Sequence, residues 1–129
     1  MVPHATVSDA NKAIEFYKAA FGAEEVRRAP GPDGKRLFFA ELKIGNSRLF
    51  LNDDFPEMCG GKSKTATSLG GTPITIHMDV TNCDAAIERV AKAGGNVTMP
   101  AADMFWGDRY GQVTDPFGLV WSFSHPLNK

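Results

Sequence analysis

The chain has 129 residues, of which 43% are hydrophobic and 22% are charged, and its formal net charge is -1. This length is typical of one small domain or of two small modules that share a core. Acids and bases nearly balance, and no basic cluster is longer than Arg27-Arg28, so we expect binding neither to nucleic acid nor to a membrane. The absence of a long apolar run and of a leader pattern favours a cytoplasmic protein.

The first half of the chain predicts one helix among four strands. An extended segment covers residues 2–7, and Ser8 is the expected cap of a helix that ends at Gly22. Apolar side chains recur at helical spacing from Ala10 to Phe21, which gives this helix one apolar face. Alternating patterns then predict strands over residues 24–28, 37–44 and 47–52. The order is therefore β-α-β-β-β.

The second half repeats the first at a constant spacing of 73 residues. At this spacing His4 aligns with His77 and Gly22 aligns with Gly95, as expected for a duplicated module. The second copy predicts an extended segment over 74–80, a cap at Thr81, a helix over 83–91 that stops at Gly95, and strands over 96–100, 109–114 and 119–124.

These patterns predict an α+β fold of two tandem β-α-β-β-β modules. The first module covers residues 1–54, a connector rich in Gly, Ser, Thr and Lys covers 55–72, and the second module covers 73–129. A module of about sixty residues covers only one face of a curved sheet. Two modules, in one chain or across a dimer, are therefore expected to enclose a cavity suited to a small molecule.

The two cysteines, Cys59 and Cys83, form no C-x-x-C pair and no framework of disulfides. We expect both thiols to be reduced. Two interpretations of Cys83 stay open: a reactive thiol in the first turn of a helix, or a small buried side chain, which we favour.

Several motifs resemble one known family. The segment Ala13-Ile14-Glu15-Phe16-Tyr17 runs into Ala20-Phe21-Gly22-Ala23-Glu24-Glu25, and Gly107-Asp108-Arg109-Tyr110-Gly111 and Asp115-Pro116-Phe117-Gly118 lie near the end. With the internal repeat, they resemble the glyoxalase/bleomycin-resistance/dioxygenase superfamily, also called vicinal oxygen chelate proteins, and within it the PhnB-like branch. The resemblance implies paired β-α-β-β-β modules, a homodimer and, in the enzymes, a divalent metal held by one residue from each of four strands.

The positions that the resemblance implies for the metal ligands carry unsuitable side chains. They fall on Val2, Leu49, Thr75 and Ser122, none of which offers a carboxylate, an imidazole or a thiolate. We therefore predict that the usual metal quartet is missing and that no metal cofactor is held there.

His4 and His77 are the catalytic candidates. Each lies two residues beyond an empty ligand position, so strand alternation places it on the same face of its strand. Asp53 is a ligand-binding candidate because we expect it on the face shared with Leu49. Three interpretations of the histidines stay open: lining of a pocket without metal, a displaced metal site completed by Asp53 or Asp79, and ordinary burial in a core.

A second group of candidates lies in a tight turn near the end of the chain. Trp106, Arg109 and Tyr110 are ligand-binding candidates, because aromatic rings can cover an apolar ligand while a guanidinium holds its carboxylate. The alternative is structural: Asp108 and Arg109 would hold the hairpin while the aromatic rings fill one end of the module.

Two functions follow from the candidates and the resemblance. The first is a small-molecule pocket protein that acts as a lyase or isomerase on an oxygen-rich or carboxylated ligand, with histidine as acid or base. The second is a non-catalytic binder that resembles bleomycin resistance proteins. A cationic drug would need an acidic groove, and the nearly balanced charge therefore favours the first function.

Overall fold

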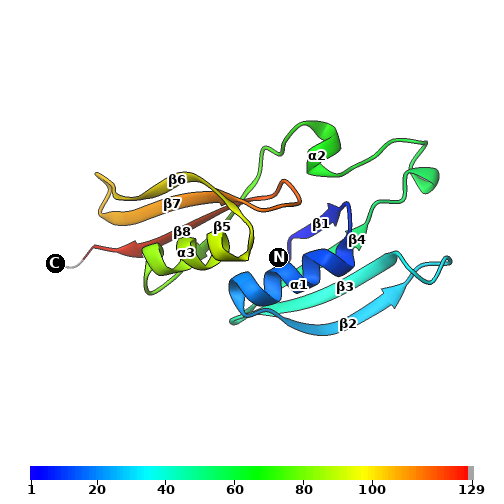
Figure 1. Ribbon diagram of the computed structural model, residues 1–129, viewed down its shortest axis with the longest axis horizontal. Coiled ribbons are helices and arrows are strands. Elements are labelled where there is room, and N and C mark those ends of the chain that lie inside the picture. The colour runs from blue at the N-terminus through cyan, green and yellow to red at the C-terminus, as the bar shows by residue number, and fades with distance from the viewer. Residues whose placement is uncertain (128–129) are drawn as a thin grey trace. The chain divides into compact units, whose positions relative to one another are not determined.

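The computed structural model describes residues 1–127 and divides into two compact units, Met1–Gly71 and Thr72–Lys129. In each unit one long helix lies across one face of a four-stranded mixed sheet (Figure 1). The two units have the same order of elements, which confirms the α+β fold of tandem β-α-β-β-β modules.

The first unit has its strands in the order β1-β4-β3-β2. Strand β1 is parallel to β4, and the other neighbours are antiparallel. The elements are β1 (His4–Val7), α1 (Ala10–Phe21), β2 (Glu24–Pro30), β3 (Leu37–Ile44) and β4 (Ser47–Asp53).

The second unit repeats this arrangement with the order β5-β8-β7-β6 and a parallel pair β5 and β8. The elements are β5 (Thr75–Asp79), α3 (Cys83–Ala93), β6 (Asn96–Asp103), β7 (Asp108–Thr114) and β8 (Val120–Pro126).

Within residues 1–127, none of the helices combines the length and the hydropathy needed to cross a membrane.

The caps of the two helices lie one residue later than predicted. Asp9 and Asn82 are the caps, in place of Ser8 and Thr81, and each side chain accepts a hydrogen bond from the amide three residues on. Gly22 ends α1 as predicted, with φ of 67° in the left-handed region. Gly94 rather than Gly95 ends α3.

Each sheet carries its apolar core on the face that its helix covers. In the first unit, Leu49 and Leu51 of β4 are at most 2% exposed beneath α1, whereas Phe50 between them lies on the opposite face and is half-buried. In the second unit, Trp121 and Phe123 of β8 are equally buried. We call the uncovered face of each sheet its open face.

A side chain at the end of each fourth strand holds the start of the helix. In the first unit, Asp53 is 4% exposed and accepts hydrogen bonds from the amides of Ala10 and Leu37, both at 2.7 Å. In the second unit, Nδ1 of His125 accepts from the amide of Cys83 at 2.8 Å. Ala10 and Cys83 are the first residues of α1 and α3, so different residue types satisfy the same orphan helical amide in the two copies.

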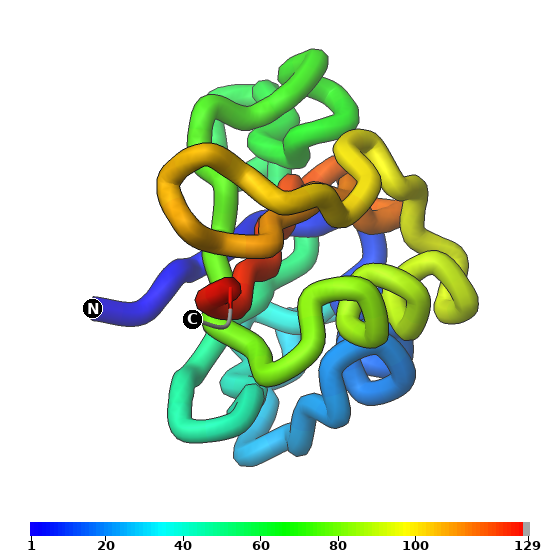
Figure 2. Tube along the Cα trace, turned by 90° about the vertical axis from the view of Figure 1, so that its left-hand side faces the viewer, coloured from blue at the N-terminus to red at the C-terminus, as the bar shows by residue number. Residues whose placement is uncertain are grey.

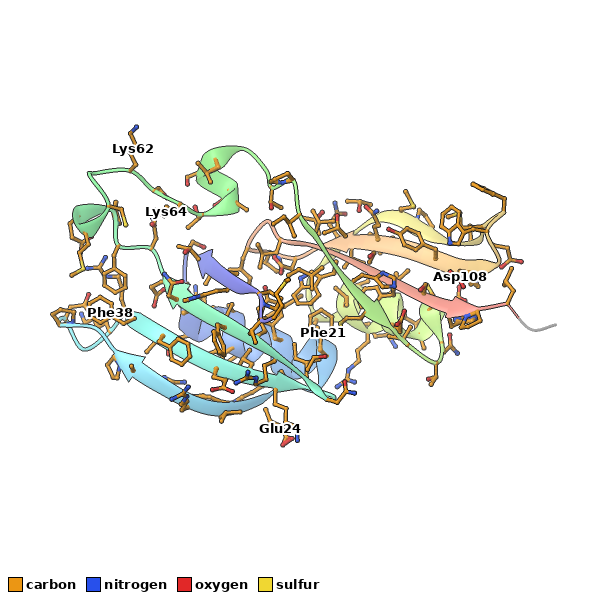
Figure 3. All side chains as sticks on the ribbon, turned by 180° about the vertical axis from the view of Figure 1, so that it is seen from behind. Phe21, Glu24, Phe38, Lys62, Lys64 and Asp108 are labelled. Carbon is orange, nitrogen blue, oxygen red and sulfur yellow. The ribbon has the colours of Figure 1, made fainter. Side chains whose placement is uncertain are left out.

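The connector is folded rather than extended. It carries η1 (Pro56–Met58) and α2 (Ala66–Leu69), and most of it belongs to the first unit, which extends past the predicted boundary at residue 54 to residue 71. Phe55 is buried against Phe38, and the centres of their rings lie 4.7 Å apart. Phe38 is labelled in Figure 3. The green part of the trace in Figure 2 shows the path of the connector.

Asp53→Asn is expected to destabilise the protein by about 1–3 kcal/mol, because an amide side chain keeps one acceptor and turns a donor toward the second buried N–H group. Urea denaturation followed by circular dichroism measures the loss. Glu88→Gln, at an exposed position of α3, is the control and is expected to stay within about 0.5 kcal/mol of the parent protein. Equal stabilities of the two variants would contradict the role of Asp53.

Candidate functional site

The open face of the second unit carries a polar cluster around His77. In the strand register, His77 of β5 lies opposite Ser122 of β8, and Tyr110 of β7 lies opposite Ser124. Because alternate residues share a face, these four side chains lie together on the side of the sheet away from α3.

Both ring nitrogens of His77 have hydrogen-bond partners. Nδ1 lies 2.8 Å from Oγ of Ser122, and Nε2 lies 3.0 Å from Oγ of Ser124 and 3.1 Å from a carboxylate oxygen of Asp79. Ser122 and Ser124 are 2% and 7% exposed, whereas the side chain of His77 is 42% exposed. The two hydroxyl groups thus hold the ring from below and leave it accessible to a small molecule.

Aromatic rings continue this cluster toward the β6–β7 turn. The ring of Tyr110 stacks on the imidazole of His77 with 6.1 Å between centroids and 12° between planes. Trp106 contacts Tyr110 edge to face, with 5.7 Å between ring centroids, and Phe105 contacts Trp106 in the same way, with 5.1 Å between centroids. The Tyr110 hydroxyl accepts a hydrogen bond from Gln112 at 2.9 Å. The predicted candidates Trp106 and Tyr110 therefore lie beside His77.

Arg109 lies apart from this cluster. It neighbours Tyr110 on one strand, so its side chain points to the opposite face, toward α3. There it donates two hydrogen bonds to Asp84, at 2.7 and 2.9 Å, and one to Asp103 at 2.9 Å. The guanidinium lowers the pKa of Asp84 by hydrogen bonding. The predicted grouping of Arg109 with Tyr110 is therefore wrong in geometry, and Arg109 ties strands to helix.

Asp53 also lies away from the open face. Its strand neighbours Leu49 and Leu51 are buried under α1, and both oxygens of its carboxylate are occupied by backbone amides. The sequence placed Asp53 correctly on the face of Leu49, but that face is the helix-covered one. Asp53 is consequently buried and holds the backbone of its own unit.

His4 occupies the position in the first unit that His77 occupies in the second, but its surroundings differ. It is exposed on β1 opposite Phe50 of β4. The imidazole meets the rings of Phe50 and Phe39 edge to face, at 5.8 and 6.1 Å. Phenyl edges provide no hydrogen-bonding group that would orient the imidazole.

The strand register changes one of the predicted metal positions. His4 pairs with Phe50 of β4, whereas His77 pairs with Ser122 of β8. The residue equivalent to Ser122 is therefore Phe50 and not Leu49, because Phe50 and Ser122 lie opposite the equivalent histidines.

The residues at the four family ligand positions do not fit a divalent ion. With the register corrected they are Val2, Phe50, Thr75 and Ser122, which offer no carboxylate, imidazole or thiolate. Within residues 1–127, no group of three or more His, Cys, Asp or Glu side chains is arranged to hold a metal.

Cys83 is fully buried at the first position of α3. Its thiol donates to the carbonyl of Phe123 at 3.3 Å, and burial raises the pKa of the thiol. These contacts support the interpretation as a buried side chain, because a reactive cysteine needs an accessible thiolate.

Sequence reasoning missed a second cluster, on the open face of the first unit. It consists of Arg27, Phe39, Glu41, Arg48 and Phe50, and we call it the arginine face. The available signal was Glu41, a charged residue inside the otherwise apolar strand β3.

Comparisons with known proteins agree with this architecture. The model of the Glyoxalase/Bleomycin resistance protein/Dioxygenase superfamily matches residues 2–123. An uncharacterized protein of Mycobacterium bovis is 54% identical over 127 residues, which are 98% of this chain and 83% of that protein. TioX from Micromonospora sp. ML1 superposes with a TM-score of 0.74 at 26% identity and 98% coverage of both chains. The chain belongs to this superfamily.

The PhnB-like branch has weaker support. A putative 3-demethylubiquinone-9 3-methyltransferase, the PhnB protein of Bacillus cereus, superposes with a TM-score of 0.70 over 97% of this chain and 98% of its own. The two sequences are only 14% identical, so this likeness shows the shared fold alone.

Arg109→Gln is expected to lower stability at neutral pH but not in acid. Since Arg109 lowers the pKa of Asp84, this pair stabilises the folded state above the ordinary carboxyl pKa of about 4, and the contribution is lost as the pH falls through the lowered value. Urea midpoints of the two proteins should differ most near pH 6 and converge toward pH 2. Lys92→Gln is the control, and a difference for Arg109→Gln that stays constant with pH would contradict the role of the pair.

Proposed function

We propose that this protein binds a small oxygen-rich or carboxylated molecule at the open face of the second unit, and that His77 transfers a proton on the bound molecule as part of a lyase or isomerase reaction. The observation that carries the proposal is the setting of His77, which is held by two buried hydroxyl groups and yet remains 42% exposed. A fixed but accessible imidazole suits acid-base chemistry near neutral pH.

The hydroxyl groups permit either protonation state of the ring. Ser122 and Ser124 can each donate or accept, so the imidazole keeps its partners before and after it gains a proton. When Nδ1–H donates to Ser122, the lone pair on Nε2 can accept a proton from a ligand. Asp79 is 93% exposed, which leaves it free to turn away when a ligand approaches Nε2. Proton transfer can then proceed without rearrangement of the buried part of the site.

A simple reaction class fits this arrangement. His77 would remove a proton from a carbon next to a carbonyl group, leaving the electron pair as an enolate. The imidazolium would return the proton to a neighbouring atom in an isomerase, or to a departing group in a lyase. Trp106 and Tyr110 would cover the apolar part of the ligand. We leave His4 out of this chemistry because its ring contacts two phenyl rings, which cannot orient it as the hydroxyl groups orient His77.

The second function, non-catalytic binding like that of bleomycin resistance proteins, differs in the charge of its ligand. Two exposed guanidinium groups, of Arg27 and Arg48, lie on the open face of the first unit. These charges disfavour a cationic ligand there, so we rank this function second.

The proposal also covers the cellular location, the oligomeric state and the family branch of the protein. We propose that the protein is cytoplasmic, because the thiols of Cys59 and Cys83 are free. We further propose a homodimer of the PhnB-like branch. Light scattering with size-exclusion chromatography tests the dimer through its mass.

Hydrogen exchange on bound ligands tests the role of His77. A thermal-shift screen of small oxo- and hydroxycarboxylic acids, with cationic glycopeptides for comparison, first selects compounds that raise the melting temperature. For a selected acid in D2O, NMR should show protein-dependent exchange of the proton beside the carbonyl. His77→Gln should slow this exchange by about a hundredfold or more, because a positioned base contributes on that order.

Two controls make this experiment decisive. Lys92→Gln, exposed on α3, should exchange at the parent rate, and EDTA should leave the rate unchanged. Unchanged exchange in His77→Gln would contradict the proposal. Stabilisation by the cationic compounds alone would instead support the second function.

A further inference from the structure

The arginine face surrounds a buried charge. Glu41 lies in the middle of β3 on the open face, and its side chain is only 7% exposed. One of its carboxylate oxygens accepts from Nε of Arg27 at 2.9 Å, and the other accepts from a terminal nitrogen of Arg48 at 3.2 Å. Hydrogen bonding to Arg27 lowers the pKa of Glu41, so the carboxylate stays ionised at neutral pH. One carboxylate therefore holds two guanidinium groups.

The aromatic rings of the same face hold these guanidinium groups as well. The guanidinium carbon of Arg27 lies 5.2 Å from the centre of the Phe39 ring, and that of Arg48 lies 5.5 Å from the centre of the Phe50 ring. The centres of the two phenyl rings lie 4.8 Å apart, with 72° between the ring planes. Each arginine is thus fixed by an ion pair and by a ring, which reduces the entropy that a ligand would have to remove.

Both arginines keep unused hydrogen-bond donors. Their side chains are 66% and 52% exposed, and each makes one hydrogen bond within the described residues 1–127, namely the bond to Glu41. A guanidinium group carries five N–H donors in a planar fork. The remaining donors of Arg27 and Arg48 are available to an acceptor from solution.

The charges of the arginine face do not cancel. Two guanidinium groups against one carboxylate leave one positive charge. Farther along the same face, Lys43 lies opposite Glu24 in the strand register, and their charges offset each other. Figure 3 shows Glu24 at the end of its strand. One arginine would be enough to balance the carboxylate of Glu41. The second arginine therefore leaves an unbalanced positive charge that suits an anionic ligand.

We propose that the arginine face is a binding site for a small molecule that carries a carboxylate on a planar aromatic ring. The carboxylate accepts from the unused donors of Arg27 and Arg48, and the ring contacts Phe50 and the exposed imidazole of His4. This site goes beyond the proposed function, because it lies in the first unit and needs no proton transfer by His77.

Calorimetric titration with 1-naphthoate and with uncharged 1-naphthamide tests the site. The parent protein should bind naphthoate roughly tenfold or more tightly than naphthamide, since only the acid makes charge-assisted hydrogen bonds. Higher ionic strength should weaken the binding of naphthoate because both arginines are exposed. NMR chemical-shift changes should fall on β2, β3 and β4.

Variants separate this site from the rest of the molecule. The double variant Arg27→Gln with Arg48→Gln should lose roughly tenfold or more in affinity for naphthoate. Arg28→Gln is the matched control, because Arg28 lies on the same strand but contacts Glu25 and Asn11 away from the arginine face. It should bind within about twofold of the parent protein. Thermal melts verify that all variants are folded.

Three results would overturn the proposal: no binding of naphthoate, equal binding of the acid and the amide, or equal losses in the double variant and in Arg28→Gln. His77→Gln should bind naphthoate normally, so a failure of this site and a failure of proton transfer by His77 are distinguishable. If the double variant fails to fold, Arg48→Gln alone should still weaken binding of naphthoate while Arg28→Gln does not.

Discussion

Each sheet of this protein has four strands but only one long helix, and this imbalance shapes both units. A helix removes one face of the sheet from water and leaves the other face without a cover from its own unit. The covered face takes the apolar side chains, such as Leu51 and Phe123. The open face is then free to carry side chains chosen for chemistry rather than for packing, which is why both clusters described above lie there.

The duplicated units keep the same skeleton while the chemistry of equivalent positions differs. At the start of the helix, Asp53 in one unit and His125 in the other accept the first helical amide, so the position was retained and the residue type changed. On the open faces, His4 and His77 are equivalent, but the first contacts phenyl rings and the second contacts hydroxyl groups. The two faces consequently suit different tasks: recognition of a planar anion in the first unit and proton transfer in the second.

Family membership alone leaves the reaction open, because the residues at the usual ligand positions do not suit a divalent ion. The chemistry has to be sought in the side chains that this chain presents. His77 with Ser122 and Ser124 offers a fixed, accessible acid or base. The arginine face offers a fixed positive charge beside aromatic rings. Each arrangement can be tested without the other.

The sequence by itself determined the architecture, because period-two and helical patterns and a repeat of 73 residues are local signals that survive without coordinates. It predicted β3 to the residue and named His77, Trp106 and Tyr110 among the candidates. Only the tertiary structure decided which face of each strand the helix covers, since alternation defines two faces but does not name the buried one. Asp53 and Arg109 therefore lie on the helix-covered faces, and the strand register identifies Phe50 rather than Leu49 as the position equivalent to Ser122.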